Sequence, residues 1–360
     1  MKKVLVIRLT SLGDVIFTLP IVNSLKNSEE ISSVGYLVAE KGLGVIKNNP
    51  AIDKVHFVPL KEWKKRPFSI KTFKEFLNIV KEIRAEKYDI ALDCQQMFKN
   101  LLLFAFCGAK RRITFKDARE LSILGGNEFI KPKAKFTDYH YHIVERNLDF
   151  ARYLGIKTCL KFSLPPLSDA VKTRVDDLLK PIDIEKKTVV ISPATTWKNK
   201  HWSEKNWAEV VKFLNDKVNL IFTGTNADVG LFDRILNSVG EEVKCINLMG
   251  KTDLNELQGV FSRVDLVLSP DSGSANLAWA CQTCAVIAIF TCTPPKRFGP
   301  YDVGEGKYFS VSQETLSENC KLDCQPCFKK KCRLKNKFKN TCTNYPDSSK
   351  IITIINKILN

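Results

Sequence analysis

The stretch VIRLTSLGDVIFTLP, residues 6–20, places Ser11 and Asp14 between two apolar runs, where a strand would end and a helix begin. In one interpretation the two residues form an S-x-x-D capping box, which satisfies free backbone N–H groups at the positive end of the helix. In the other, the turn lies at the carboxyl edge of a parallel sheet, where open α/β proteins bind ligands, and Asp14 is a general base. These residues alone leave both interpretations open.

A second junction, SPDSGSANLAWA at residues 269–280, follows an apolar run and opens a helical pattern. Gly273 lets a ligand approach the backbone closely, and Ser272 and Ser274 offer hydroxyl groups beside the free N–H groups of the helix start. Such a turn can hold a diphosphate. The alternative is an ordinary helix capped by serine.

A third junction, SPATTWKNKHW at residues 192–202, supplies the hydroxyl groups of Thr195 and Thr196 and the cation of Lys200. This combination suits a phosphate oxygen, although a polar loop without a ligand is the alternative. Both junctions end strands of the same half of the chain, so one shared anion site is predicted. The chain has neither G-x-G-x-x-G nor G-x-x-x-x-G-K-[ST], so a dinucleotide or P-loop site is not supported.

The cysteines gather near the C-terminus in the pattern Cys324-x2-Cys327-x4-Cys332-x9-Cys342, with Cys320 just before it. Four thiolates at this spacing can form a tetrahedral structural zinc site, and free or redox-paired thiols are the alternative. We expect this segment to be distant from the phosphate-binding loops. The other seven of the twelve cysteines lie among apolar residues and are expected to be small buried side chains.

The elements that position these residues alternate between strand-like and helical patterns. Strands are expected at VLVIRL, VGYLVA and YDIALD in the first half, and at TVVISP, NLIFTGT, VDLVLSPD and AVIAIF in the second. This alternation predicts an α/β fold with two doubly wound parallel sheets. The connection Leu164-Pro165-Pro166 separates domains 1–164 and 167–346, and a cleft between two domains is a favoured ligand site. Residues 347–360 form an amphipathic helix with Asp347 and Ser348 as candidate caps, and packing back on the hinge is one placement for it.

Composition restricts the class of protein further. The chain has 360 residues and 44% hydrophobic content, enough for two domain cores. It has no apolar run of about 20 residues, and Arg8 interrupts the first apolar run too early for a signal peptide, so a cytoplasmic location is expected. The formal charge of +17 favours an anionic partner such as a phosphorylated glycolipid, an anionic membrane surface or nucleic acid. No nucleic-acid-binding motif is present, so no nucleic acid partner is expected.

Four motifs together resemble a known family. RLTSLGDVIFTLP, ATTWKNKHW, PDSGSANLAWA and TPPKRFGPY occur in the order and spacing of the ADP-heptose:lipopolysaccharide heptosyltransferases, glycosyltransferase family nine, and the similarity covers essentially the whole chain. The resemblance implies a GT-B fold, with two Rossmann-like domains facing across a cleft, the first binding mainly the acceptor and the second mainly the nucleotide sugar. It implies inverting transfer of heptose from ADP-heptose to the lipid-anchored inner core of lipopolysaccharide, by an enzyme bound peripherally to the inner membrane. No cofactor is then expected for catalysis.

The resemblance also assigns roles to residues. Asp14 becomes the catalytic base, and Lys200 stabilises the charge that develops on the leaving ADP. The residues implied for the donor are Ser11, Gly13, Thr195, Thr196, Lys200, Asp228, Asp271, Ser272, Gly273 and Ser274. Those implied for the acceptor are Lys61, Lys64, Lys99, Arg119, His142 and Arg146. Many members have histidine where this chain has Asn276, so a contact made by that ring is lost.

The residues leave some alternatives open. His142 and Arg146 are four residues apart and are expected on one helix face, whereas Lys61 and Lys64 could equally be solubilising surface lysines. A nucleotide-sugar epimerase, or a transferase of a different sugar on the same scaffold, is the main functional alternative. A basic nucleic-acid-binding protein is the less favoured one.

Overall fold

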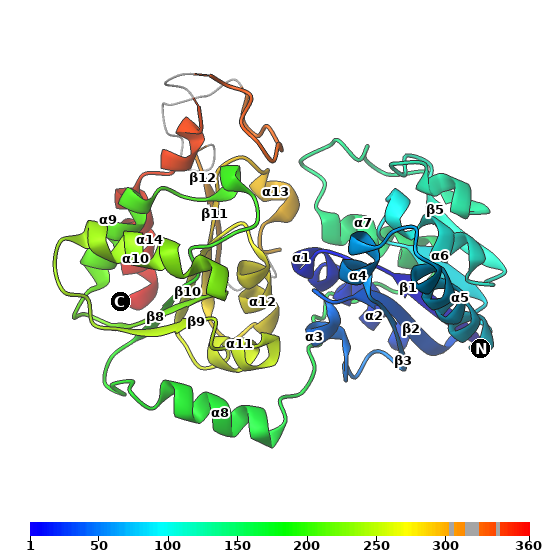
Figure 1. The fold of residues 1–360 in the computed structure, drawn as a ribbon, viewed down its shortest axis with the longest axis horizontal. Coiled ribbons are helices and arrows are strands. Elements are labelled where there is room, and N and C mark those ends of the chain that lie inside the picture. Colours follow the sequence, from blue (N-terminus) through cyan, green and yellow to red (C-terminus); the bar gives the residue numbers. More distant parts are fainter. Residues whose placement is uncertain (302–305, 314–323, 336–338) are drawn as a thin grey trace. The chain divides into compact units, whose positions relative to one another are not determined.

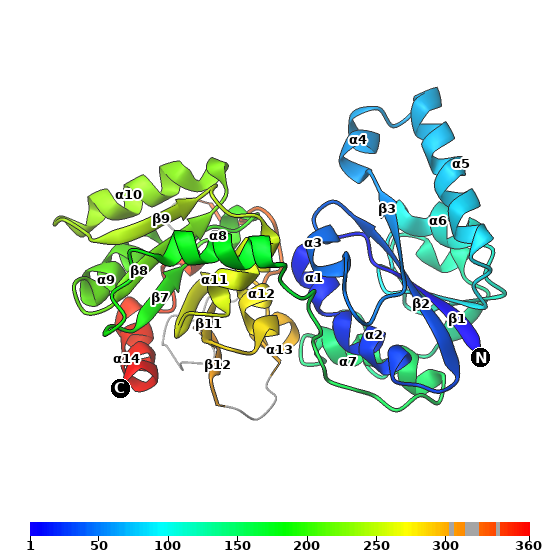
Figure 2. The ribbon, with the colours of Figure 1, turned by 90° about the horizontal axis from the view of Figure 1, so that it is seen from below.

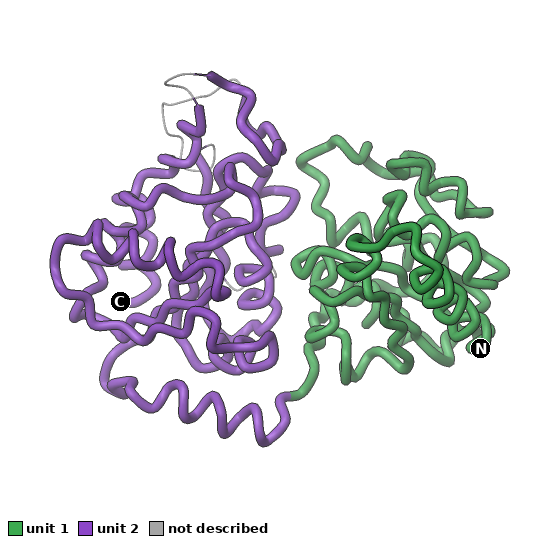
Figure 3. The backbone as a smooth tube through the Cα atoms, viewed as in Figure 1, with its two compact units in different colours: residues 1–166 green, residues 167–360 purple. Residues whose placement is uncertain are grey.

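The computed structural model describes residues 1–301, 306–313, 324–335 and 339–360. These residues form two compact units, 1–166 and 167–360 (Figure 3). Each unit contains one parallel six-stranded sheet with its own helices (Figure 1). The prediction of two doubly wound α/β halves is therefore confirmed.

The sheet of the first unit has the strand order β3-β2-β1-β4-β5-β6. Its strands are β1 (Lys2–Ile7), β2 (Ile31–Ala39), β3 (Lys54–Val58), β4 (Ile90–Asp93), β5 (Arg111–Phe115) and β6 (Glu128–Ile130). The helices between and after them are α1 (Leu12–Ile16), α2 (Leu19–Lys26), α3 (Leu43–Ile46), α4 (Leu60–Lys65), α5 (Ile70–Ala85), η1 (Phe98–Asn100), α6 (Leu101–Phe106), η2 (Ser122–Gly125) and α7 (Ile143–Tyr153).

Strand β1 lies where the strand order of this sheet reverses, because β2 and β3 follow on one side of it and β4, β5 and β6 on the other. It pairs with β2 on one side and with β4 on the other, both in parallel. Val4, Leu5, Val6 and Ile7 are completely buried, as expected for a strand of a parallel sheet that is covered on both faces. The turn that follows β1 and carries Asp14 therefore lies at the topological switch point, where open α/β sheets bind ligands.

The second unit repeats this plan with the strand order β12-β11-β10-β7-β8-β9. Its strands are β7 (Thr188–Ile191), β8 (Asn219–Gly224), β9 (Cys245–Met249), β10 (Leu266–Pro270), β11 (Ala285–Phe290) and β12 (Tyr308–Ser312). Its helices are α8 (Asp169–Leu179), η3 (Lys198–Lys200), α9 (Glu204–Leu214), η4 (Asn226–Asp228), α10 (Val229–Val239), α11 (Leu254–Phe261), α12 (Gly273–Cys281), α13 (Pro295–Phe298), η6 (Thr341–Asn344) and α14 (Ser348–Leu359). The switch point lies between the neighbouring strands β7 and β10, which precede the two predicted phosphate-binding turns.

The C-terminal helix α14 belongs to the second unit. Its N-cap is Asp347, whose carboxylate accepts a hydrogen bond from the Ser349 N–H at 3.0 Å. Ile351 and Ile355 are fully buried in the core of that unit, and the helix packs against α9. The sequence predicted packing on the hinge as one placement for this helix. In the structure its apolar face contributes to the core of the second unit. Among the described residues, no helix has both the length and the apolar character needed to cross a bilayer.

Candidate functional site

Asp14 forms an ion pair with a buried arginine. The Arg8 side chain is 8% exposed, and its Nη2 lies 2.6 Å from Oδ1 of Asp14. Oδ2 of Asp14 accepts hydrogen bonds from the Ser11 N–H at 3.0 Å and from the Ser11 hydroxyl at 2.9 Å. The expected capping box between Ser11 and Asp14 is therefore present.

These contacts determine the charge of Asp14. Burial favours the neutral acid, but the Arg8 guanidinium and the two hydrogen bonds from Ser11 outweigh burial and lower the pKa of Asp14. The carboxylate is therefore ionised at neutral pH and able to accept a proton. Its side chain keeps 29% exposure, so a substrate can still reach it.

The loop after β4 holds the Asp14 turn from the neighbouring strand. Gln95 Oε1 accepts hydrogen bonds from the N–H groups of Leu9 and Thr10, both at 3.0 Å. Lys99, predicted to bind the acceptor, donates from its ammonium group to the Thr10 hydroxyl. Burial and then the nearby Arg8 charge lower the pKa of Lys99 to about 8. Lys99 thus lies beside the proposed base and loses its charge in a mildly alkaline solution.

The remaining predicted acceptor residues fall into two groups. Lys61 and Lys64 are exposed on α4, and neither has an ion-pair partner among the described residues. The Arg119 guanidinium lies 3.9 Å from the centre of the Phe136 ring, and burial, followed by the Arg8 charge, lowers its pKa. These three cations, like Lys99, keep some exposed surface to offer an anionic ligand.

His142 and Arg146 have internal partners instead. Helix α7 begins at Ile143, so His142 is its N-cap, with the ring Nδ1 accepting from the Val144 N–H at 3.1 Å. The prediction that the pair shares a helix face is therefore wrong, because His142 has an extended backbone. Arg146 is 1% exposed, and its Nη2 lies 2.5 Å from Oδ1 of Asp117. Both side chains stabilise the first unit, and a direct role in acceptor binding stays a prediction.

In the second unit, the loops after β7, β10 and β11 meet at Asp271. Lys200 Nζ lies 2.6 Å from Oδ2 of Asp271, and both side chains are largely buried, with 16% and 7% exposure. Thr293, from the loop after β11, donates to the same oxygen at 2.5 Å. The Thr195 hydroxyl donates to the backbone carbonyl of Asp271 at 3.0 Å. The predicted residues Thr195, Lys200 and Asp271 are therefore brought together.

The turn that follows Asp271 opens helix α12. Ser272 is the N-cap, and its hydroxyl oxygen accepts from the Ala275 N–H at 3.3 Å. The capping interpretation is confirmed, and it is compatible with an anion site, because Gly273 and Ser274 in the first turn retain accessible surface. Asn276 is 5% exposed on the same helix, so the residue that replaces the histidine of many members is buried.

Two other predicted donor residues have different surroundings. Asp228 lies after β8, and its Oδ2 accepts from the Thr225 N–H at 2.8 Å and from the Thr225 hydroxyl at 2.6 Å. These bonds fix the carboxylate in the η4 turn, at the same carboxyl edge of the sheet as Asp271. Thr196 is exposed next to Thr195. Ser11 and Gly13 belong to the first unit, and their approach to donor phosphates stays a prediction.

The cysteine-rich segment packs directly on the Lys200 loop. Asn199 donates from its side chain to the Lys329 carbonyl at 2.9 Å, and the Phe328 N–H donates to the Cys292 carbonyl at 2.9 Å. The centre of the Phe328 ring lies 5.5 Å from the centre of the Trp197 ring and 5.4 Å from the centre of the Phe298 ring. The expectation that this segment is distant from the phosphate-binding loops is therefore wrong.

The segment that carries the four predicted zinc ligands is joined to the loop after β11 by the Phe328–Cys292 backbone bond. Burial, and then the proximity of Cys327, Cys332 and Cys324, raise the pKa of Cys342 to about 12. Within the described ranges, no three Cys, His, Asp or Glu side chains are close enough to hold a metal ion. Cys320 lies outside the described residues. The zinc site stays a prediction.

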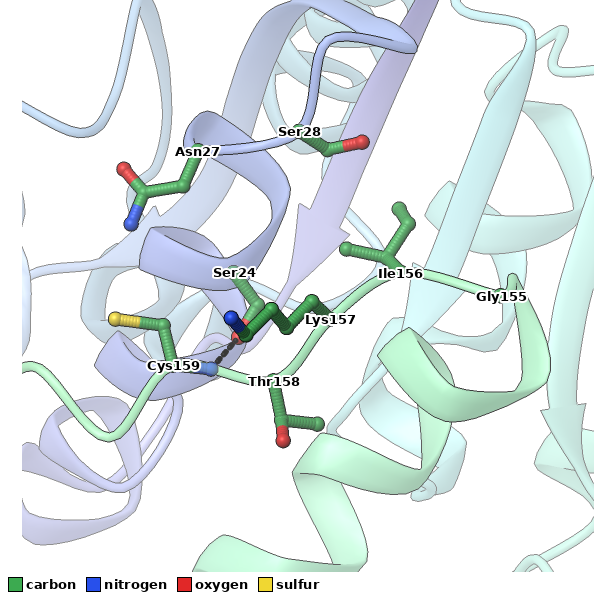
Figure 4. Close-up of a pocket in the computed structure, with 8 residues that line it drawn as sticks. All are labelled: Ser24, Asn27, Ser28, Gly155, Ile156, Lys157, Thr158 and Cys159. Atoms are coloured by element: carbon green, nitrogen blue, oxygen red, sulfur yellow. Dashed lines mark hydrogen bonds between the residues drawn. The ribbon is translucent and has the colours of Figure 1, made fainter.

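A pocket of about 370 Å³ lies in the first unit, between the end of α2 and the segment that follows α7. Its lining includes Ser24, Asn27 and Lys157, and the Cys159 N–H donates to the Ser24 hydroxyl at 2.8 Å (Figure 4). None of the predicted site residues lines it. This pocket is therefore separate from the groups around Asp14 and Asp271.

Sequence reasoning missed two residues that organise the site. Arg8 ends the apolar run of β1, and a charged side chain at the end of a fully buried strand signals a charged partner nearby. Thr293 is the first residue of the motif TPPKRFGPY, but that motif did not indicate which side chain Thr293 contacts. Its role becomes evident only where three loops meet at Asp271.

Comparisons with known proteins identify similar sequences and similar folds. Lipopolysaccharide core heptosyltransferase OpsX of Haemophilus influenzae is 28% identical over 312 residues, which cover 84% of this chain and 82% of the relative. The structure of a family 9 glycosyl transferase from Veillonella parvula is similar with a TM-score of 0.78 and 16% identity, covering 99% of this chain and 97% of that one. E. coli heptosyltransferase WaaC with ADP has a TM-score of 0.72 and 20% identity, covering 99% of each chain. A further structure holds WaaC with ADP-2-deoxy-2-fluoro heptose.

These structural similarities confirm the predicted GT-B class, with two Rossmann-like domains. The sequence model described as "Glycosyltransferase family 9 (heptosyltransferase)" matches residues 76–338, which is more than half of the chain. The family resemblance seen in the sequence is thereby confirmed: this chain belongs to glycosyltransferase family 9.

Proposed function

We propose that this protein transfers a heptose from ADP-heptose to the inner core of lipopolysaccharide, with inversion at the anomeric carbon. The observation that carries the proposal is the meeting of three loops at Asp271 beside the N-terminus of α12, in a chain of this family. The name of the Haemophilus influenzae relative and the donor analogue in the WaaC structure support the acceptor class and the donor.

The second unit binds the donor diphosphate. The free N–H groups and positive end of α12, at Ser272, Gly273 and Ser274, favour an anion. Lys200 adds a cation that Asp271 and the Trp197 ring hold in place, with Nζ 4.9 Å from the ring centre. Because Asp271 already balances the Lys200 charge, much of the attraction for the diphosphate comes from the helix terminus.

Asp14 acts as the general base in the first unit. The acceptor hydroxyl oxygen forms a bond to the anomeric carbon while the bond from that carbon to the diphosphate oxygen breaks. The hydroxyl proton moves to the Asp14 carboxylate, and ADP leaves with the bonding electron pair. Burial would raise the pKa of Asp14, but Arg8 and Ser11 keep it low, so Asp14 is a weak base. The proton therefore moves to Asp14 after the attack on the anomeric carbon has made the hydroxyl acidic. Lys200 and the α12 terminus stabilise the charge that grows on the diphosphate.

The first unit binds the acceptor through its basic residues. Lys99 lies beside the Asp14 turn, and Lys61, Lys64 and Arg119 retain accessible surface for phosphate and carboxylate groups of the acceptor. The protein works in the cytoplasm, bound peripherally to the inner membrane, where its charge of +17 attracts anionic lipid. No nucleic acid partner is required.

A structural zinc ion bound by Cys324, Cys327, Cys332 and Cys342 completes the proposal. Thiolates are suitable zinc ligands, and the spacing of the four cysteines along the chain supports the proposal. The ion would stabilise the segment that packs on the Lys200 loop, and it would take no part in bond making.

Incubation with ADP-heptose and a series of truncated lipopolysaccharide acceptors tests the proposed function. Mass and linkage analysis of the products is expected to show one added heptose on an inner-core acceptor, with none when Asp14→Asn replaces the wild type. An isomerised free nucleotide sugar, with no glycosylated acceptor, would instead indicate an epimerase. Transfer from a different nucleotide sugar alone would overturn the donor assignment.

A further inference from the structure

Helices α4 and α5 form a hairpin that carries large apolar side chains into solvent. Phe68 is 99% exposed, Ile70 75%, Phe73 60% and Leu77 47%. Figure 2 shows α4 and the first turns of α5 standing away from the strands of the first unit. We name these four residues the apolar tip. Exposed apolar residues gathered in this way mark an interaction site more often than isolated ones do.

Hydrogen bonds and an ion pair hold the hairpin that carries the apolar tip. Nη2 of Arg66 lies 3.0 Å from both carboxylate oxygens of Glu75, and the Trp63 ring N–H donates to Glu75 at 3.0 Å. The Ser69 hydroxyl caps α5 by accepting from the Thr72 N–H at 3.1 Å. These bonds link α4 to α5 and hold the intervening turn in a defined conformation.

Helix α5 has an apolar surface that is mostly buried in its C-terminal half and mostly exposed in its N-terminal half. Ile79, Val80 and Ile83 face the core of the first unit and are buried. Ile70, Phe73 and Leu77 have the spacing i, i+3, i+7, which places them together on an exposed stripe in the N-terminal half of the helix. Only the buried part of this apolar surface packs on the helix's own domain. The exposed stripe therefore requires another explanation.

The two helices of the hairpin also carry exposed lysines. Lys61 and Lys64 on α4, and Lys71, Lys74 and Lys81 on α5, are all exposed. None of the five has an ion-pair partner among the residues that the structure describes, whereas Lys65 is paired with Glu62. Apolar side chains flanked by unpaired lysines are typical of segments that lie in the interface of an anionic bilayer.

We infer that the apolar tip inserts into the boundary between head groups and acyl chains of an anionic membrane. The inference rests on the peripheral membrane association of the proposed function and names the surface responsible for it. Lys71, Lys74 and Lys81 contact anionic head groups, and Phe68, Ile70, Phe73 and Leu77 enter the apolar layer. Electrostatic attraction is screened by salt, whereas apolar insertion is not, so the tip supplies the part of the binding that persists at high salt.

The same hairpin carries two of the predicted acceptor residues, Lys61 and Lys64 on α4. A tip anchored in the membrane would keep this basic surface next to an acceptor whose lipid lies in the same bilayer.

Vesicle binding tests the inference. The full-length protein is mixed with phosphatidylcholine vesicles that contain phosphatidylglycerol, at low and high salt, and bound protein is measured by sedimentation. Phe68→Ser combined with Phe73→Ser should weaken binding at high salt by about tenfold, with an unchanged Tm, because both side chains are exposed. Ile184→Ser is the matched control, since Ile184 is 90% exposed in the second unit and should not affect binding.

The outcomes separate the inference from the proposed function. Wild-type binding that disappears at high salt, or that the double variant leaves unchanged, would overturn insertion while peripheral association still stands. Equal weakening by Ile184→Ser would also overturn it, because the effect would then be a general loss of apolar surface. If the wild type binds no vesicles at any salt concentration, both the inference and the peripheral location fail. Heptose transfer is tested independently, by the products formed from ADP-heptose and a soluble acceptor.

A second measurement reports the depth of the tip. Phe68→Trp adds a fluorophore whose emission should be quenched by lipids brominated on the acyl chains, beyond the quenching seen for the wild-type tryptophans. Absence of this extra quenching in bound protein would place residue 68 outside the apolar layer and overturn insertion.

Discussion

Nη2 of Arg8 lies 2.6 Å from Oδ1 of Asp14, and this ion pair fixes the proposed base at the end of the central strand of the first unit. Burial alone would make Asp14 a neutral acid. Arg8, together with the N–H and hydroxyl of Ser11, reverses that tendency and keeps the carboxylate ionised. The two sequence interpretations of Asp14 are therefore compatible, because one oxygen contacts Ser11 at the helix start and the other contacts Arg8.

Replacement of the base is the first test. Asp14→Asn should lower kcat by about 10²-fold or more, because an amide cannot accept the hydroxyl proton. ADP binding should be retained, since the helix terminus at Ser272 and Lys200 belong to the second unit. Steady-state kinetics and calorimetry with ADP measure the two effects. Ser11→Ala is the matched control, because it removes one hydrogen bond and keeps the carboxylate. Near-normal turnover of Asp14→Asn would leave Asp14 with a capping role only.

The pH dependence of catalysis tests the role of Arg8. In the wild type, the lowered pKa of Asp14 keeps the carboxylate ionised, so kcat/KM should have no acidic limb near neutral pH. Arg8→Gln removes the charge that opposes the effect of burial, so the pKa of Asp14 should rise and the acidic limb should move to higher pH. A pH profile identical to that of the wild type would show that Arg8 does not control the base.

Lys99 supplies a test on the alkaline side. Its pKa of about 8 means that the ammonium is charged below this pH and neutral above it. If Lys99 contacts an anionic acceptor group, the acceptor KM should rise as the pH passes through about 8, and the donor KM should not. Lys99→Arg should remove this rise, because arginine keeps its charge throughout this range. A rise that persists in Lys99→Arg would assign the titration to another group.

The fold and part of the site could be predicted from the sequence. Apolar runs and short turns are local patterns, so the two parallel sheets and the turns at Asp14, Lys200 and Ser272 could be predicted from the sequence. Contacts between distant segments were not, because no local pattern encodes them. Thr293 on Asp271 and Phe328 beside Trp197 depend on loops that are far apart in the chain. His142 was misplaced for a related reason: its side chain caps α7, and a histidine is an uncommon N-cap.

Mutations can separate the roles of Lys200 and Asp271. Lys200→Ala should lower kcat/KM for the donor by about 10²-fold, because it removes a cation from the leaving diphosphate, and it should leave the acceptor KM unchanged. Asp271→Asn keeps the Lys200 cation but removes its charged partner, which lies 2.6 Å away. We expect this variant mainly to raise the donor KM, since Lys200 is then less well positioned. Unchanged donor kinetics in Lys200→Ala would exclude Lys200 from the site.

Removal of the proposed zinc ion should affect donor binding through the segment that holds it. Gently purified protein should contain about one equivalent of zinc, measured by elemental analysis. Chelation should weaken ADP binding, because Phe328 lies between Trp197 and Phe298, and Lys329 accepts from Asn199 in the turn that carries Lys200. Phe328→Ala should weaken ADP binding in the same direction while the zinc content stays at about one equivalent, which separates loop support from metal binding. Metal-free protein with normal ADP affinity would refute the zinc site, and full ADP affinity in Phe328→Ala would show that the segment does not support the donor loop.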